Sequence, residues 1–569
     1  MKKTLLLLFI ANITLTHFSQ TYDWSASFGA FNIDVARKIE TDSKGNTYLF
    51  GEFNGTIDFN PGPGVNNLTS AGPDISMFLV KLDSNKNFIW GKKIKDNSSV
   101  FPKAGDITID NNDNVFISAQ FNQSISVPLI TGIDTLVAQG NNPDIFLLKI
   151  NPMGNFIWIK SISGAGGQEL LTNLKTDKNS NLYISGTYRD TLFVDNSSRA
   201  NFLLAEDTYN GFLLKLSSEG DFVWANNVSS SKNLRLSIIG SENNNIYLIG
   251  FFENILKVYY NSSLDTLSSM GSKDIFISKI DTNGNLIWNK TIGGGSNDFA
   301  NMASAIDGNA NIYISGEFSG VVDFDPNIGI TNLTSVSAIN SFALKMDNSG
   351  NYIFAKQWDA RFDINALVID KDNKLILGGN FTQPIDFDLG LNTNRLTPNR
   401  SSIPLRNSVT GYVLRLNQNG ELEFAKKLNG TSNTILLDVS TSHNSFYFCG
   451  YYDGTCELDL NSTTNTTTSQ GSFDVFIVKM SLSPSNTSSL ENHTSATNLT
   501  AFPNPTNGNI TIDGIRLTET NYAIFNPEGK QLQVNRNGNT LNTEKLLRGM
   551  YVIRVMDNGT AKHVKFIKQ

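Results

Sequence analysis

The chain has few of the residues that most enzymes use for chemistry. Its 569 residues include only two cysteines and four histidines, and the formal net charge is −7. Three histidines follow the first twenty residues (His443, His493 and His563), too widely separated to supply a zinc site or a Ser-His-Asp triad. The negative charge provides no basic footprint for nucleic acid. After the N-terminus, no apolar run approaches the roughly 18 residues of a membrane-spanning helix.

The two cysteines, Cys449 and Cys456, lie close together in the sequence. A hairpin turning at Asp453-Gly454 would place them on one face in diagonal register. In an oxidising compartment they could form a local disulfide, and the alternative is two buried thiols.

The first twenty residues have the pattern of a secretory signal peptide. Lys2 and Lys3 precede an apolar stretch from Thr4 to Leu15, and Phe18-Ser19-Gln20 offers a cleavage region. No cysteine follows, so a lipoprotein anchor is not expected. We predict an exported chain with residues 1–20 as signal peptide.

One phrase, typified by "DIFISKIDTNGNLIWNKTI" from Asp274, recurs through most of the chain. Its last aromatic residue appears 64 to 70 residues apart at Trp24, Trp90, Trp158, Trp224, Trp288, Phe354 and Phe424. Its first aromatic residue appears at Phe78, Phe146, Phe212, Phe276, Phe342, Tyr412 and Phe476. The two series are offset by one strand, because Trp24 has no such strand before it and Phe476 has no Trp strand after it.

Each unit carries four alternating, β-branched or aromatic segments separated by Asn-Gly and Asp-x-x-Gly-Asn turns, which predicts four antiparallel strands. No helical periodicity is sustained. We predict an all-β fold, with residues 21–482 as a seven-bladed β-propeller whose last blade is completed by the N-terminal strand. An open β-solenoid is the alternative, but it does not explain the offset. We expect the tryptophans to pack between blades rather than to form sugar platforms.

The segment "SAIDGNANIYISGEFSGVVDFDP" (Ser304 to Pro326), followed by "DxFxxKxDxxGNxxW", resembles the bacterial SBBP-type β-propeller repeat of exported Bacteroidetes proteins. The resemblance covers all seven units, although units three and four lack the DFDP element. It implies a fold and export rather than an activity.

The long connections of all blades should meet on one face, where binding residues are favoured. Our predicted ligand face consists of acidic residues in these connections, namely Asp34, Asp58, Glu169, Asp298, Asp323, Asp325, Asp386 and Asp388. The pairs Asp323/Asp325 and Asp386/Asp388 could hold calcium, the one cofactor considered. The alternative is that they cap turns through hydrogen bonds to the backbone.

Residues 483–500 are rich in Ser, Thr and Asn, as in a flexible linker. Residues 501–569 contain short strands and Asn-Gly turns that predict a small β-sandwich. This tail closely resembles the type A C-terminal sorting domain of the type IX secretion system. The matching residues are Pro503, Asn504, Pro505, Gly508, Gly529, Lys530, Gly549 and Tyr551. By resemblance, the tail directs the chain across the outer membrane, after which the body is released or attached to the surface.

We therefore expect a secreted or outer-membrane surface-attached binding or adhesion module that passes through the periplasm. Its expected partners are the type IX secretion machinery and an extracellular glycan or protein. Two alternatives stay open. One is an extracellular carbohydrate-active enzyme that uses residues such as Asp298, Asp323 and Asp325, and the other is a structural surface component.

Overall fold

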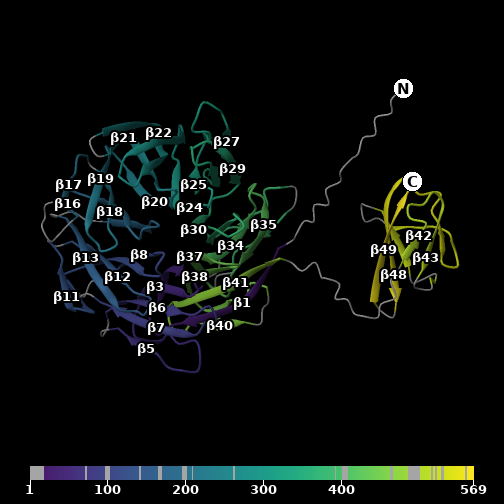
Figure 1. Cartoon of the computed structure of the whole chain (residues 1–569), viewed down its shortest axis with the longest axis horizontal. Coiled ribbons are helices and arrows are strands. Elements are labelled where there is room, and N and C mark those ends of the chain that lie inside the picture. Colours follow the sequence, from purple (N-terminus) through teal and green to yellow (C-terminus); the bar gives the residue numbers. More distant parts are fainter. Residues whose placement is uncertain are drawn as a thin grey trace. The chain divides into compact units, whose positions relative to one another are not determined.

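Figure 1 presents the chain as a computed structural model. The structure describes residues 18–70, 74–95, 103–139, 142–164, 170–194, 201–207, 209–260, 263–390, 393–399, 408–461, 465–484, 500–513, 517–518, 522–526, 531–557 and 560–569. Within these ranges every regular element is a β-strand, which confirms the predicted all-β class. Phe18–Pro484 form one compact unit, called here the body, and the strands from Thr500 onward belong to another, the tail.

The body is built from seven successive groups of four antiparallel strands, which we call sheets 1 to 7. Sheets 1 to 3 comprise β2 (Val35–Thr41), β3 (Thr47–Phe53), β6 (Ser76–Leu82) and β7 (Phe88–Ile94); β8 (Lys103–Ile109), β9 (Val115–Phe121), β12 (Asp144–Ile150) and β13 (Phe156–Gly164); and β14 (Leu170–Thr176), β15 (Leu182–Tyr188), β18 (Tyr209–Leu216) and β19 (Phe222–Ser230).

Sheets 4 to 6 comprise β20 (Leu234–Glu242), β21 (Asn245–Tyr260), β22 (Ser263–Asp281) and β23 (Leu286–Gly294); β24 (Phe299–Ile306), β25 (Ile312–Phe318), β28 (Asn340–Met346) and β29 (Tyr352–Trp358); and β30 (Asp363–Ile369), β31 (Leu375–Phe381), β34 (Thr410–Leu416) and β35 (Leu422–Lys427). Sheet 7 comprises β37 (Thr434–Ser442), β38 (Ser445–Tyr452), β41 (Asp474–Pro484) and β1 (Phe18–Phe28).

The first strands of the seven sheets contact one another in cyclic order. β2 contacts β8, and the series continues through β14, β20, β24, β30 and β37 back to β2. Figure 1 shows these strands around the centre of the body, with later strands of each sheet towards the outside. Middle strands such as β3, β6, β25 and β28 are buried along their whole length. Because both of their faces are covered, each sheet packs between two neighbours, as in a propeller-like arrangement.

Sheet 7 takes its outer strand from the other end of the body. β1 pairs antiparallel with β41, from Phe18 opposite Pro484 to Phe28 opposite Val475, and Trp24 lies opposite Lys479. The pairing that the one-strand offset predicts is therefore present. No turn joins these two strands, because more than four hundred residues separate them along the chain.

The recurring Trp and Lys residues connect one sheet to the next. Trp90 Nε1–H donates to the backbone carbonyl of Pro152, at 3.2 Å, and Lys81 Nζ donates to the same oxygen at 3.4 Å. Pro152 belongs to the outer turn of sheet 2. Gly154 in that turn has φ +83°, and a Cβ there would lie 3.0 Å from the Trp90 ring. Packing between sheets thus accounts for the recurring sequence motif that contains these Trp and Lys residues.

The same connection recurs around part of the body. Three further Trp–carbonyl hydrogen bonds have donor–acceptor distances of 3.0 to 3.2 Å, namely Trp24 to Ser84, Trp158 to Ser218 and Trp224 to Thr282. The lysines that donate to these three carbonyls are Lys479, Lys149 and Lys215. The first of these links sheet 7 to sheet 1, across the point where the chain begins and ends its circuit.

Six of the seven sheets have a small hairpin in the connection between their second and third strands. They are β4 (Thr56–Asp58) with β5 (Asn67–Thr69), β10 (Ser124–Leu129) with β11 (Gly132–Val137), β16 (Thr191–Phe193) with β17 (Phe202–Leu204), β26 (Val321–Asp323) with β27 (Asn332–Thr334), β32 (Ile385–Asp386) with β33 (Arg395–Leu396), and β39 (Thr455–Glu457) with β40 (Thr466–Thr468), the last extended by β36 (Asn429–Gly430). The β26–β27 and β32–β33 hairpins carry the Asp-x-Asp sequences, and the β4–β5 hairpin carries the related Asp58-Phe59-Asn60.

Cys449 and Cys456 are both buried, free thiols in the structure, as in the alternative to a disulfide. The predicted hairpin between them is wrong, because β38 pairs with β37 and β41, whereas β39 pairs with β36 and β40. Cys449 packs in the core between sheets 7 and 1, and Cys456 packs in a different apolar cluster.

The tail consists of two four-stranded sheets. One has the order β42 (Thr500–Phe502), β43 (Asn509–Asp513), β47 (Thr540–Asn542), β46 (Arg536–Asn537), and the other β45 (Gln531–Leu532), β44 (Tyr522–Phe525), β48 (Gly549–Asp557), β49 (Thr560–Lys568). Both contribute to one apolar core that includes Ile510, Leu541, Ile553 and Phe566. This is the layering expected of a small β-sandwich.

Candidate functional site

Two of the predicted ligand-face residues, Asp34 and Asp298, are completely buried. Asp34 accepts hydrogen bonds from the backbone N–H groups of Ala30 (2.7 Å) and Asn54 (3.0 Å). Asp298 accepts the equivalent bonds from Gly294 (2.7 Å) and Ser319 (3.4 Å). Burial raises the pKa of Asp34 to about 6 and that of Asp298 to about 7. Each carboxyl group thus binds the backbone of a segment that connects one sheet to the next.

The Asp-x-Asp sequences also bind their own backbone. Asp323 Oδ1 accepts from the N–H groups of Asp325 (3.0 Å) and Thr331 (2.8 Å). Asp386 Oδ1 accepts from the N–H groups of Asp388 and Asn394.

Asp58 repeats the pattern with the N–H groups of Asn60 and Asn66. The residue between the two carboxylates or their equivalents, such as Phe59 or Phe324, is fully buried. The repeated motif therefore seats an aromatic residue and closes a hairpin.

The structure does not gather the seven predicted residues that it describes into one site. Glu169 lies outside the described residues. Among the residues that are described, no group of three or more His, Cys, Asp or Glu side chains could hold a metal ion. Calcium binding by Asp323, Asp325, Asp386 or Asp388 stays a prediction.

In the tail, the Pro503-Asn504-Pro505 segment is bound to the last strand. Asn504 Nδ2 donates to the carbonyl of Lys565, and its Oδ1 accepts from the N–H of Ile567, both at 2.9 Å. Gly508 accepts from the backbone N–H of Thr543 at 3.0 Å.

Further along the tail, Tyr551 donates to the carbonyl of Leu547 and stacks on Phe566. Gly549 opens β48. Gly529 and Lys530 lie outside the described residues.

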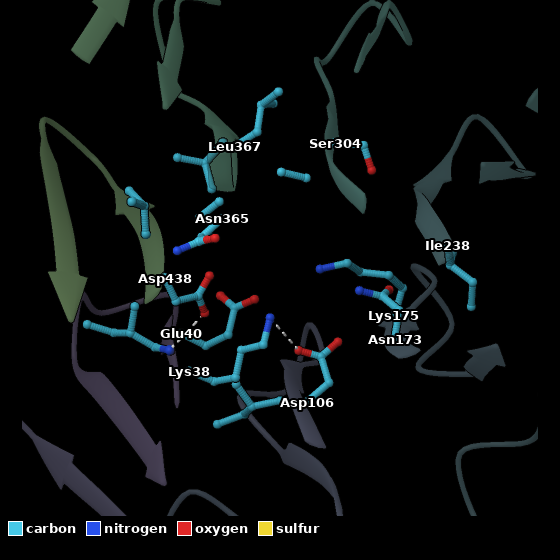
Figure 2. A pocket seen from close by; sticks show the side chains of 16 residues that line it. Lys38, Glu40, Asp106, Asn173, Lys175, Ile238, Ser304, Asn365, Leu367 and Asp438 are labelled. Atoms are coloured by element: carbon cyan, nitrogen blue, oxygen red, sulfur yellow. Dashed lines mark hydrogen bonds and ion pairs between the residues drawn. The ribbon is translucent and has the colours of Figure 1, made fainter. Parts of the chain in front are cut away.

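A polar cavity of about 90 Å³ lies where the first strands of the sheets meet. Figure 2 shows Lys38, Glu40, Asp106, Lys175 and Asp438 around it. These charged side chains come from β2, β8, β14 and β37, in sheets 1, 2, 3 and 7. The wall from sheets 4 to 6 is formed by neutral residues, including Ile238, Ala303, Ser304, Asn365 and Leu367.

Irregular pairing shapes this cavity. In all seven sheets, the register between the first and second strands shifts near the middle of the first strand, as between Ala36 and Lys38 or between Leu436 and Asp438. A β-bulge inserts an extra residue and turns side chains to a new direction. Lys38, Asn173 and Asp438 directly follow such shifts and line the cavity.

Most charged groups in the cavity have partners within its wall. Lys38 Nζ lies 3.3 Å from Asp106 Oδ1, and Asp106 Oδ2 accepts from the N–H of Leu174 at 2.9 Å. Asp438 Oδ2 accepts from the N–H of Ile39 at 3.0 Å. Glu40 Oε2 accepts from Ser440 Oγ at 3.3 Å.

Crowding of charge shifts the ionisation of these groups. Burial raises the pKa of Glu40 to about 7, against the favourable field of Lys175. Burial also raises the pKa of Asp438 above its usual range. Burial alone would lower the pKa of Lys38, but the Asp106 and Asp438 carboxylates outweigh it and raise that pKa. Near neutral pH, Glu40 can therefore take up or release a proton.

Two polar groups in the wall stand apart from this network. Asn173 Oδ1 is buried and accepts no hydrogen bond in the described part of the chain. Lys175, two residues further along β14, forms no ion pair within 4 Å with any described residue. Figure 2 shows its side chain extending towards Glu40. Residues two apart on a strand share a face, so both groups are presented to the cavity.

Sequence reasoning did not find this cavity. Its signal was nonetheless present, because charged residues interrupt first strands that are otherwise apolar or small, as in "VARKIET", "AGDITI" and "TILLDVS". Recognising it required the ring order of the sheets and the position of each bulge, and neither can be read from one repeat.

Comparison with known families and proteins identifies the tail. Residues 500–569 match the family described as the secretion system C-terminal sorting domain. The sorting domain predicted from the Pro503 segment onward is thereby confirmed. The chain is a secreted or cell-surface protein handled by the type IX secretion system. None of the described residues belongs to a helix long and apolar enough to cross a membrane.

The body resembles a repeat protein. An uncharacterised WD repeat-containing protein of Acanthamoeba polyphaga mimivirus is 24% identical over 500 residues, which cover 74% of this chain and 35% of that protein. The chain thus spans about a third of the length of this curated relative. WD repeats form the blades of β-propellers, so this likeness and the cyclic sheet order both indicate a propeller-like body.

Solved structures resemble the chain only remotely. A protein of unknown function from Bacteroides caccae shares 9% identity, covers 62% of this chain and 89% of its own, and has a TM-score of 0.28. The extracellular domain of a putative one-component system from B. thetaiotaomicron shares 11% identity over 97% of this chain and 98% of its own, with a TM-score of 0.17. TM-scores of this size do not establish a shared fold.

Proposed function

We propose that the chain is an exported binding protein whose body is a seven-bladed β-propeller of the SBBP type. The proposed plan is a signal peptide (1–20), a propeller (21–482), a linker (483–500) and the sorting domain (501–569). Cyclic contacts between first strands and the β1–β41 pairing support the blade count and the closure. Because β1 begins at Phe18, cleavage after residue 20 would shorten it by only three residues.

The observation that carries the binding function is the central cavity with two polar groups left unpaired. A buried acceptor without a partner is costly to keep, and Asn173 Oδ1 and Lys175 face the same cavity. A ligand that satisfies both groups would remove that cost. We propose that the extracellular ligand, a glycan, a protein or a small molecule, places a polar group in this cavity.

The test is binding by the secreted full-length protein to arrays of glycans, matrix proteins and small metabolites, with calcium and with chelator. Binding that is lost in Lys175→Met but kept in Lys178→Met would support the cavity, because Lys178 is exposed on the same sheet. Binding that requires calcium and survives Lys175→Met would move the site to the Asp-x-Asp hairpins. Self-association without any ligand would favour a structural surface component.

The enzymatic alternative has less support from the geometry. A glycosidase needs two carboxyl groups facing its substrate, but both oxygens of Asp298 are bound to backbone N–H groups. Turnover of a polysaccharide that is lost on Asp323→Asn and Asp325→Asn, with the fold intact, would establish the enzyme instead.

The export route has a separate test. Deleting residues 501–569 should strand the body in the periplasm, because the sorting domain is what the secretion system handles. Normal release of the shortened chain would refute this route.

A further inference from the structure

We infer that the central cavity binds a small zwitterion of the α-amino acid class. This inference rests on the proposed binding function and narrows its ligand. Three properties of the cavity lead to it: its size, its balance of charge and the two groups that its own wall leaves unpaired.

Size limits the ligand first. The cavity has a volume of about 90 Å³, whereas most pockets for drug-sized ligands are several times bigger. A small ligand such as alanine, with its six non-hydrogen atoms, is therefore favoured. We expect a hexose or an aromatic amino acid to bind more weakly.

The charge balance then selects a zwitterion. Lys38 and Lys175 face the three carboxyl groups of Glu40, Asp106 and Asp438. The formal charge of the cavity is −1 with all five groups ionised and 0 with Glu40 protonated, so a simple anion leaves a negative net charge in both states. A simple cation would satisfy the carboxylates but would leave the Lys175 ammonium unpaired beside it. A zwitterion adds no net charge and supplies both signs.

The unpaired groups give the orientation. Lys175 is the cation without a carboxylate within 4 Å among the described residues, so its ammonium is available to donate to the ligand carboxylate. Asn173 Oδ1, on the same face of β14, is available to accept from the ligand ammonium. Glu40, towards which Lys175 extends in Figure 2, supplies a second acceptor when it is ionised.

The wall from sheets 4 to 6 suits a small uncharged substituent. Ile238, Ala303 and Leu367 line it together with the polar but uncharged Ser304 and Asn365. A ligand held by its charged groups at β14 would turn its α-carbon and side chain towards this wall. Glycine and alanine satisfy this arrangement, whereas amino acids with longer side chains need more space.

The experiment is calorimetric titration of the secreted full-length protein with glycine, L-alanine, acetate, methylammonium and L-tryptophan at constant ionic strength. We expect glycine and alanine to bind at least tenfold more tightly than the other three. Lys175→Met should weaken alanine binding at least tenfold, whereas Lys178→Met should leave it unchanged. Asn173→Leu, which removes an unpaired acceptor and so should fold, is a second variant and should also weaken binding at least tenfold.

Acetate or methylammonium binding as tightly as alanine would overturn the inference, as would alanine binding that neither Lys175→Met nor Asn173→Leu weakens. Absence of amino acid binding together with an array ligand that depends on Lys175 would also overturn it, while leaving the proposed binding function standing. Absence of both would remove both proposals.

Discussion

The contacts between sheets 7, 1, 2, 3 and 4 differ from the contact between sheets 6 and 7. Across the first four junctions, a tryptophan and a lysine converge on one backbone carbonyl of the next outer turn, as Trp90 and Lys81 do at Pro152. At the junction of sheets 6 and 7, the equivalent residues are Phe424 and Arg415. Phe424 stacks on Phe446, and Arg415 binds Asp370 within its own sheet.

The difference follows from the way sheet 7 is made. Its outer strand is β1, and no turn joins β1 to β41, so sheet 6 faces no outer-turn carbonyl. The hydrogen-bonding indole and ammonium are replaced there by a phenyl ring and a guanidinium that is neutralised locally. The joint absence of Trp and Lys at this junction supports a role for the pair in contact between sheets. At the junction of sheets 5 and 6 only the Trp is replaced, by Phe354, and a Cβ on Gly420 of the outer turn would lie 2.9 Å from its ring.

The largest expected effect comes from removing the strand that creates this difference. Deleting residues 21–28, which keeps the predicted signal peptide and its cleavage region, should prevent the body from forming a stable fold. β41 would lose most of its partner strand, and its buried apolar residues would be exposed. Circular dichroism and thermal melting measure this loss. The matched control is deletion of residues 501–569, which should leave the body's melting transition unchanged. A body without β1 that melts normally would contradict the proposed closure.

Arg415 should be the most sensitive single side chain at the junction of sheets 6 and 7. It is fully buried, and its guanidinium binds Asp370 and, at 2.8 Å, Glu423. Arg415→Met leaves the buried Asp370 carboxylate without its cation, whereas Glu423 keeps its ion pair with Lys374. We expect a cost of about 3–5 kcal/mol of unfolding free energy. Urea denaturation checks this value. A loss below about 1 kcal/mol would mean that the Asp370 carboxylate is readily solvated.

A smaller effect compares two tryptophans in the same structural position. Trp90→Phe removes the hydrogen bond to Pro152 and should cost about 1 kcal/mol. Trp288 Nε1 is buried without a hydrogen-bond partner among the described residues. Trp288→Phe should therefore be neutral or slightly stabilising. Equal losses in the two variants, measured by urea denaturation, would show that ring size rather than the hydrogen bond links the sheets.

The smallest effect depends on pH. Burial raises the pKa of Glu40 to about 7 in the folded body, whereas the unfolded value lies near 4.3. The folded state thus holds an extra proton between these values, and its contribution to stability is full below about pH 4 and is lost as pH rises to 7. We expect a loss on the order of 1 kcal/mol, allowing for screening inside the open cavity.

Glu40→Gln should flatten this part of the profile of unfolding free energy against pH. Glu219→Gln should not, because the Glu219 side chain is 68% exposed. Any remaining slope in Glu40→Gln reports on the other carboxyl groups whose pKa values burial raises in the same direction, among them Asp34, Asp144, Asp298 and Asp438. An unchanged slope would mean that Glu40 is ionised throughout this range.

The sequence predicted the fold better than the site. Alternation, turn residues and the offset between Trp24 and Phe476 depend on local chemistry, and they led to the strands and to the β1–β41 pairing. The role of the acidic loop residues could not be predicted from the sequence, because the same carboxyl oxygens that suit a cation also suit backbone N–H groups, as at Asp323. The central cavity depends on bulges in several distant strands, which no single repeat reveals.

The pairing of β1 with β41 also constrains the order in which the body can be completed. During synthesis, the strand that emerges first must wait for one of the last strands of the body before it has a neighbour. A chain interrupted before Asp474 leaves β1 unmatched, however many of the intervening sheets have folded. Completion of the body therefore requires synthesis of the chain beyond this point, and the sorting domain begins only at residue 500.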